Sequence, residues 1–233
     1  MIPLGHVGAK GLAGPSIPGG SWSLPVGVPD PLVWLTPEHV IEDGTPEITR
    51  IPNRGSGGSQ FDATKYGGTS NAKISQPAGW NSKDVFDTTA GTSGGYRLAA
   101  SCPARTVISL STYEAGAATF SNYDGLVANT VGGSFQMVGD STKTNFFAGS
   151  SDTVYKDGAA IATPTSAILP LSKNGVAIQR SASGYSIQTL WHDDFSTARY
   201  WNGLTGDILI WQELLTATQV QDVHDNLIAY FTP

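Results

Sequence analysis

The 233-residue chain has little of three things that restrict function: cysteine, charge and long apolar runs. Cys102 is the single cysteine, so no disulfide bond can form within the chain. Charged residues make up 14% of the sequence, against about 25% in average globular proteins, so the surface must be covered largely by uncharged polar side chains and glycine. No apolar run reaches the roughly 20 residues that a membrane-spanning helix needs.

The charge that is present is acidic. The formal net charge is -6 and the isoelectric point is about 5.0, and no stripe of Lys and Arg interrupts this balance. Such a surface repels the phosphate backbone of nucleic acids and anionic lipid headgroups. We therefore expect neither nucleic acid nor a membrane as a partner.

We expect no secretory signal at the N-terminus. Its first residues include no basic region, and Pro3 and Gly5 interrupt the apolar stretch that a signal peptide requires. Together with the lone cysteine, this favours synthesis in a reducing cytosol, whatever compartment the protein finally occupies.

Residues 1–30 predict an extended N-terminal arm. They contain seven Gly and five Pro, and their hydrophobic residues follow neither a helical nor a strand period. Such an arm packs on its own domain or is held by a neighbouring protein. The candidates for partner contacts are Ile2, Leu4, Ile17 and Trp22, with Trp22 as the intermolecular anchor because aromatic residues dominate interface hot spots.

From residue 31 to residue 233 short apolar runs alternate with turn clusters, which predicts one all-β domain. In the segment 105–113, the residues Val107, Ser109, Ser111 and Tyr113 alternate with Ile108, Leu110 and Thr112. Such alternation predicts one buried and one polar face. The whole pattern fits a two-sheet antiparallel sandwich or jelly roll. The expected strands are 31–35, 96–100, 105–113, 134–138, 153–156, 159–162, 176–180, 185–190 and 207–211.

Two local motifs are specific. Asp157-Gly158 lies between two apolar segments and predicts a type I′ hairpin, in which both central residues have positive φ. Thr216 and Gln219 have the spacing of a helix capping box, preceded by Leu215. The helix that begins there presents one apolar face, made of Val220, Val223, Leu227 and Phe231.

The C-terminal segments 199–203, 205–211 and 214–216, followed by a helix that ends near residue 230, resemble the concanavalin A-like, laminin G-like domain family. Asp207 stands where that family more often has Glu. The turn at Val154–Gly158 resembles the family's Tyr-Val-Asn/Asp-Gly turn, and the loop Ile51–Gly58 resembles an Asn-x-Gly-Ser-Gly loop of its phage-borne members. The resemblance is best over residues 150–231.

This resemblance implies a jelly-roll sandwich of two antiparallel sheets, a fold that serves many functions. Its members include carbohydrate-binding modules, adhesion domains and structural proteins of bacteriophage heads and tails. Related domains bind calcium through loop carboxylates, for which Asp193, Asp194, His192 and Asp152 are the candidates here. A hydrated loop with charges for solubility is the favoured interpretation of these residues, because the alternating spacing of a dedicated calcium loop is missing.

No catalytic site is expected. Retaining glycosidases need two carboxyl groups about 5 Å apart, whereas Glu42 and Glu47 lie in a segment with the composition of a solvated turn. Gly91–Gly95 matches a nucleophile-elbow pattern, but a strand follows where a helix is required. Cys102 is predicted to be a buried core residue.

Tryptophans could form a platform for sugar rings. Core positions are expected for Trp34, Trp201 and Trp211, which lie in or beside apolar strands, and looser ones for Trp22, Trp80 and Trp191.

Two functions remain open at this point. The first is a non-enzymatic bacteriophage virion protein, a capsid decoration or cement protein or a tail component, located in the virion and bound to coat or tail subunits in a symmetric assembly. The alternative is a lectin-like module that binds glycan on a host surface. An enzyme of carbohydrate metabolism would need a polysaccharide substrate, which the distribution of acidic residues and histidines does not support.

Overall fold

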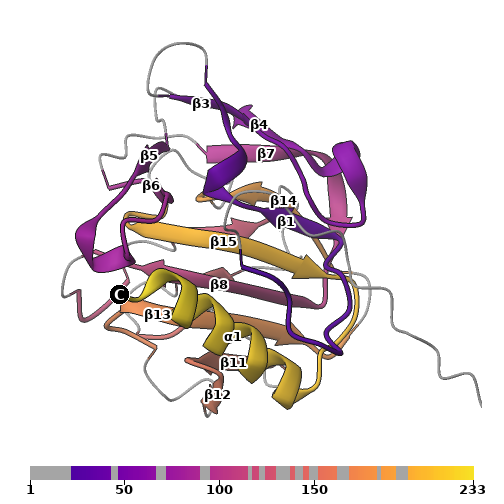
Figure 1. Ribbon diagram of the computed structural model, residues 1–233. Coiled ribbons are helices and arrows are strands. Elements are labelled where there is room, and N and C mark those ends of the chain that lie inside the picture. The colour runs from indigo at the N-terminus through magenta and orange to yellow at the C-terminus, as the bar shows by residue number, and fades with distance from the viewer. Residues whose placement is uncertain are drawn as a thin grey trace, which may run out of the picture.

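Two antiparallel β-sheets packed face to face make up the protein, and one α-helix covers the outer face of the larger sheet (Figure 1). The computed structural model describes residues 22–42, 47–66, 72–89, 95–114, 117–120, 124–129, 137–139, 144–146, 152–161, 168–182, 185–192 and 199–233. The expected all-β, two-sheet antiparallel class with one C-terminal helix is confirmed.

The first sheet has eight strands among the described residues. Along the sheet they run β12 (Ala159–Ile161), β11 (Asp152–Lys156), β13 (Ser172–Arg180), β8 (Thr106–Thr112), β15 (Leu204–Trp211), β6 (Val85–Asp87) and β5 (Lys73–Ser75), and β1 (Val33–Leu35) pairs with β15 beside this path.

The second sheet has seven strands among the described residues. Their order is β10 (Met137–Val138), β9 (Gly125–Ala128), β14 (Ser186–Leu190), β7 (Gly95–Pro103), β4 (Ala63–Tyr66), β3 (Ile48–Ile51) and β2 (Ile41–Glu42). Three short 3-10 helices lie between strands. The first, η1 (Pro37–His39), connects β1 of the first sheet to β2 of the second, whereas η2 (Gly58–Phe61) lies between β3 and β4 and η3 (Ala78–Trp80) lies between β5 and β6.

Strand β8 is central and buried on both faces, which corrects the expectation of one polar face. Ile108 and Leu110 belong to the apolar layer beneath the helix, and Val107 belongs to the core between the sheets. Ser109 and Ser111 are also buried, with their hydroxyl oxygens 3.3 Å apart. The helix covers the face of Ile108 and Leu110, and the face of Val107, Ser109 and Ser111 is turned to the core between the sheets, so neither face meets water.

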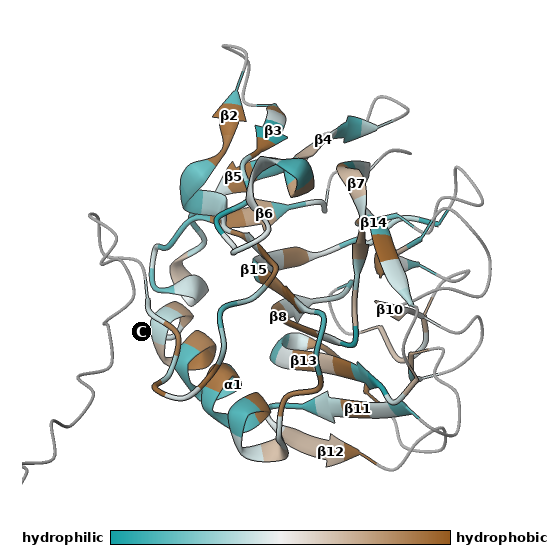
Figure 2. Ribbon diagram, turned by 90° about the vertical axis from the view of Figure 1, so that its right-hand side faces the viewer, coloured by the Kyte–Doolittle hydropathy of each residue, from teal (hydrophilic) through white to brown (hydrophobic). Residues whose placement is uncertain are grey.

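The helix α1 (Ala217–Phe231) begins at the predicted residue. The Thr216 hydroxyl accepts from the Gln219 amide, and the Gln219 side chain accepts from the Thr216 amide, which completes the capping box. Figure 2 shows hydrophobic and hydrophilic residues alternating along this helix. The four apolar residues predicted for its buried face are buried. Within the described residues, no helix is long and apolar enough to cross a membrane.

The predicted hairpin is confirmed. Asp157 and Gly158 have φ of 50° and 79°, as a type I′ turn requires, and β11 pairs with β12 across it. The tryptophans differ from expectation: the looser positions expected for Trp22, Trp80 and Trp191 are wrong, because all six indoles of the chain are buried.

Candidate functional site

Residues 22–30 lie against the sandwich and run beside helix α1; we call them the strap. Three side chains of the sandwich donate hydrogen bonds to its carbonyl oxygens. Trp211 Nε1 bonds Pro29 at 2.8 Å, Gln219 Nε2 bonds Gly27 at 2.7 Å, and Asn226 Nδ2 bonds the carbonyl of Ser23 at 3.4 Å. The chain therefore approaches its first strand along a defined path on the outer face of the first sheet.

Trp22, the first residue of the strap, takes part in a buried polar cluster. Trp22 is 9% exposed, and its ring lies 5.2 Å from that of Trp34, at an angle of 48°. Both indole N–H groups donate to Oδ2 of Asp207, Trp22 at 2.9 Å and Trp34 at 2.6 Å. Asp207 on β15 thus links the strap to strand β1; we call these three residues the Asp207 cluster.

Asp207 is 2% exposed, and burial raises the pKa of its carboxyl from 3.8 to about 7. Hydrogen bonds from Trp34, Trp22 and Thr36 lower this pKa, and the charge of Glu38 raises it. The balance follows the general rule that burial penalises the charged form of an acid unless donors compensate fully. Near neutral pH the buried carboxyl can therefore change its protonation state.

Glu38, the acidic residue that acts on Asp207, is itself held in place by a hydrogen bond. Tyr230 of α1 donates a hydrogen bond from its hydroxyl to Glu38 on η1, and the ammonium of Lys83 lies 4.3 Å from the centre of the Tyr230 ring. Burial, followed by the hydrogen bond to Glu38 and the charges of Glu38, Asp207 and Asp84, raises the pKa of Tyr230. The end of helix α1 and η1 thus lie close enough to the cluster for their charges to act on it.

A second polar centre supports β1 from its other edge. The Asn53 side chain accepts from the backbone amides of Trp34 (2.8 Å) and Gly55 (2.9 Å), and it donates to the carbonyls of Leu32 (3.1 Å) and Gly58 (3.0 Å). All four hydrogen-bonding positions of an amide side chain are used. The loop after β3 therefore pairs with β1 in the place of a further strand.

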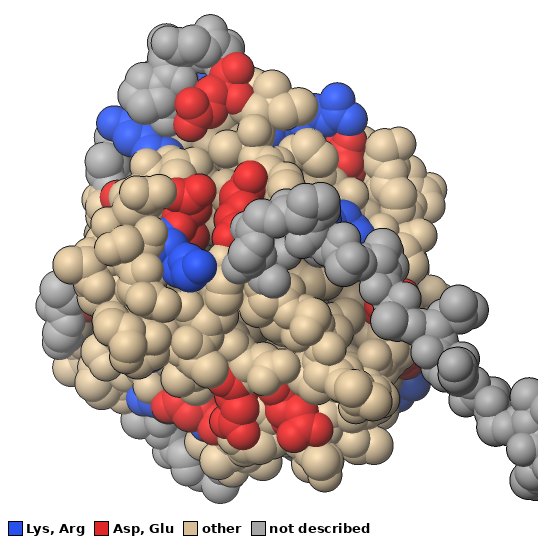
Figure 3. Space-filling model, in the orientation of Figure 1, with Lys and Arg blue, Asp and Glu red and all other residues tan. Residues whose placement is uncertain are grey.

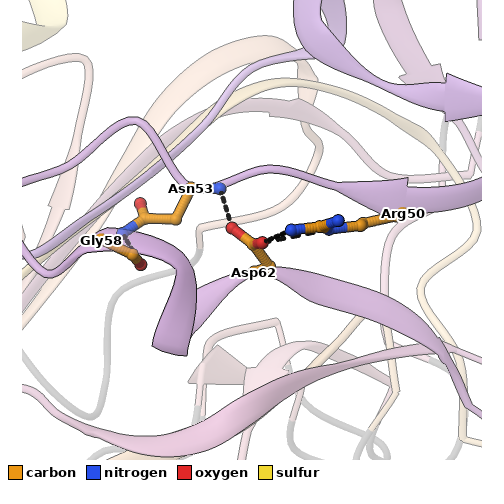
Figure 4. Close-up of polar contacts among 4 residues, drawn as sticks. All are labelled: Arg50, Asn53, Gly58 and Asp62. Carbon is orange, nitrogen blue, oxygen red and sulfur yellow. Dashed lines mark hydrogen bonds and ion pairs between the residues drawn. The ribbon is translucent and has the colours of Figure 1, made fainter.

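Asp62 fixes Asn53 in turn (Figure 4). Its Oδ1 accepts a hydrogen bond from the backbone amide of Asn53 at 2.7 Å. Its Oδ2 accepts from Nε of Arg50 at 3.0 Å and forms an ion pair with the same guanidinium. A Cβ atom at Gly55 would lie 2.6 Å from the carbonyl oxygen of Leu32, so the loop needs glycine there. The loop Ile51–Gly58 thus holds strand β1 in place.

Two of the four calcium candidates lie outside the residues that the structure describes. Asp193 and Asp194 lie outside the described residues, and His192 ends the segment before them. Asp152 is buried in an ion pair with Arg180. Among the residues that the structure describes, no three His, Cys, Asp or Glu side chains gather where they could hold a metal ion.

Of the four partner-binding candidates, only Trp22 lies within the described residues. Ile2, Leu4 and Ile17 lie outside the described residues, so their role stays a prediction. Trp22, expected to reach a neighbour, instead packs within its own chain, because Asp207 and Trp34 offer it a hydrogen-bond acceptor and an aromatic surface.

Other sequence candidates are settled in part. Cys102 is buried, and burial raises the pKa of its thiol to about 12, which fits a core residue. The turn between Glu42 and Glu47 and the Gly-rich motif at 91–94 lie outside the described ranges. The Asp207 cluster was not predicted from sequence; the one signal was an Asp inside an otherwise apolar strand.

Uncharged side chains cover most of the face seen in Figure 3. Acidic side chains gather along one side of helix α1 and again over the strands at the opposite end of this face, with few basic groups between them. This distribution agrees with the acidic composition.

No protein-family model and no curated protein match the sequence. Among solved structures, the chain is similar to a Trypanosoma rangeli sialidase in complex with sialic acid, with 12% identity over 82% of this chain and 32% of that chain, and a TM-score of 0.34. The chain thus spans about a third of that protein, and a likeness this weak carries no argument about activity.

Proposed function

We propose that the chain is a non-enzymatic structural protein of a bacteriophage particle, a decoration or cement protein that binds neighbouring coat subunits. The observation that carries this proposal is the anchored strap. Trp22 donates a hydrogen bond to Asp207, and four further hydrogen bonds and one ring contact of the strap and β1 fix the path of the chain on the sandwich. The chain therefore has a fixed position at Trp22, the residue to which residues 1–21 are joined.

A fixed joint suits a protein that binds by reach. Residues 1–21 carry Ile2, Leu4 and Ile17 among Gly and Pro, a composition fitted to lie on a partner's surface or along a sheet edge. Repetition around a symmetric particle multiplies weak contacts through avidity. In this proposal the sandwich supplies bulk and orientation, and the N-terminal segment supplies the attachment.

The glycan-binding alternative is not supported by the positions of the tryptophans. A sugar platform requires an exposed aromatic face, and all six tryptophans are buried. Tyr66, 39% exposed, is the large aromatic ring that remains at the surface among the described residues, and the guanidinium of Arg97 lies 4.1 Å from its centre. Glycan binding is therefore kept as an outcome of the test.

The test compares the full chain with a variant that lacks residues 1–21 and keeps Trp22. Particles purified from cells that carry the gene are examined by quantitative mass spectrometry. We expect the full chain in a fixed ratio to the coat protein, and loss of the shortened chain from particles although its melting temperature is unchanged. Absence of the full chain from particles would overturn the proposal. Specific binding on a glycan array that survives the deletion would establish the alternative.

A further inference from the structure

The strap is held by few contacts for a segment of nine residues. It forms no β-ladder with the sandwich, its turn leaves Val26 fully exposed (103%), and three side-chain hydrogen bonds reach its backbone. Leu24 and Val28 pack partly against the layer beneath it. Segments with exposed backbone and little buried apolar area open at low free energy, so the Asp207 cluster is the main attachment.

That attachment contains a carboxyl group with no cation beside it among the described residues. Oδ2 of Asp207 accepts both indole N–H groups, and the side chain is shielded from water by Trp22 and Trp34. When the strap lifts, Trp22 leaves and water can reach Asp207. A buried carboxyl holds its proton more tightly than a hydrated one, so the closed and open states bind different numbers of protons.

We propose that the strap is a releasable element whose closed position binds a proton at Asp207, so that rising pH opens it and frees residues 22–30 to extend from the sandwich. Nine released residues add about 30 Å of reach. This inference concerns the isolated chain and does not depend on the proposed function: the closed strap keeps the fixed position at Trp22, and opening moves that position away from the sandwich.

The surroundings of Asp207 set the direction of the effect. Glu38 is the acidic group that acts on it directly, and it raises the pKa of Asp207; Tyr230 donates to Glu38, and Asp84 and Lys83 lie near Tyr230. Strand β1 contributes the Trp34 indole and no charge, and the strap contributes the Trp22 indole; the one charged residue of the strap, Asp30, is exposed. Burial holds the pKa of Asp207 near 7 in the closed state, and hydration in the open state returns it toward 3.8.

The test is hydrogen exchange of the tryptophan indole N–H groups, followed by NMR between pH 5 and pH 8 and corrected for the intrinsic effect of pH. The two pKa values predict that opening becomes up to about a hundredfold more favourable over this range. We expect protection of the Trp22 indole to fall by more than tenfold. Trp201 is the internal control, because its indole donates to the Thr112 carbonyl at 2.9 Å in the core between the sheets.

Two variants complete the test. Asp207→Asn has no proton to release, so Trp22 protection should become independent of pH. Glu38→Gln removes the charge that raises the pKa of Asp207 in the closed state, so the fall in protection should end at a lower pH and be smaller. This expectation holds even if Asp207→Asn does not fold. Protection that changes less than threefold, or that falls equally for Trp22 and Trp201, overturns the inference. So does an unchanged fall in either variant. None of these outcomes bears on the presence of the chain in particles.

Discussion

His224 offers the sharpest test of how burial controls stability in this protein. It lies on α1 with its ring fully buried (0% exposed) against β13, and within the described part of the chain its two ring nitrogens have no hydrogen-bond partner of good geometry. Burial lowers the pKa of His224 from 6.5 to about 4, and the backbone of Val176 and the charges of Asp157 and Asp225 offset this in part. The folded protein therefore holds a neutral imidazole down to acidic pH.

The sign of the pH effect follows from these two values. Above pH 6.5 the imidazole is neutral in both the folded and the unfolded chain, so its protonation does not affect stability. As the pH falls from 6.5 to 4, the unfolded chain gains a proton that the folded chain does not. His224 should therefore lower the free energy of unfolding by about 3 kcal/mol at pH 4 relative to pH 8.

The perturbation is His224→Leu, an apolar side chain of similar size. At pH 8 the variant should be at least as stable as the wild type, because two buried polar atoms without partners are removed. Towards pH 4 the difference should grow in favour of the variant by about 3 kcal/mol. Urea unfolding followed by tryptophan fluorescence measures it at each pH.

A matched control is His39→Gln on η1. The pKa of His39 is lowered by burial and by Arg54, and raised by Glu38, but the residue is only partly buried, so its replacement should change the pH dependence much less. Parallel curves for wild type and His224→Leu would refute the reasoning, because a water-accessible imidazole would then occupy this position.

Three further substitutions test individual contacts by urea unfolding. Gly175→Ala places a Cβ 2.9 Å from the His224 ring and should destabilise by about 1 to 3 kcal/mol, with recovery when His224 is also replaced by Ala; no recovery would mean that the clash lies elsewhere. Asn53→Ala removes four hydrogen bonds and should reduce stability by about 3 kcal/mol, whereas a loss below about 1 kcal/mol would contradict its supporting role. Thr216→Ala should lose about 1 kcal/mol through the helix cap; the exposed Thr218→Ala should be near neutral, and equal losses would refute the cap.

Local signals in the sequence predicted the local structure. The hairpin at Asp157-Gly158 and the capped helix at Thr216 each depend on residues close together in the chain, so their chemistry can be recognised without the fold. The expected strands correspond to β1, β7, β8 and β11 to β15, and β10 falls at the end of the expected segment 134–138. The sequence did not predict the short strands β2 to β6 or β9. Whether an apolar strand is buried on one face or two was not predictable, because the cover of β8 comes from a helix that begins about a hundred residues later.

The Asp207 cluster shows why the candidate site could not be predicted. Trp22 and Trp34 lie 185 and 173 residues from Asp207 in sequence, and they meet through the pairing of β1 with β15. An acidic residue in an apolar strand indicates a buried polar contact but does not name its partners. The contact of Trp22 with Asp207 could not be foreseen, because its hydrogen-bond acceptor lies 185 residues away in the sequence.

Asp207 and His224 act on stability in opposite directions, which gives a final prediction. As the pH rises from 4 to 6.5, the raised pKa of Asp207 removes about 3 kcal/mol of stability, while the lowered pKa of His224 restores about 3 kcal/mol. The two contributions nearly cancel in the wild type. We expect unfolding free energy to rise with pH in Asp207→Asn, to fall in His224→Leu, and to stay flat in the double variant. Slopes of the same sign in both single variants would show that other groups govern the pH dependence. Opposite slopes that cancel would mean that two buried groups, one under the strap and one under the helix, together keep the sandwich stable across this range while leaving the strap alone responsive to pH.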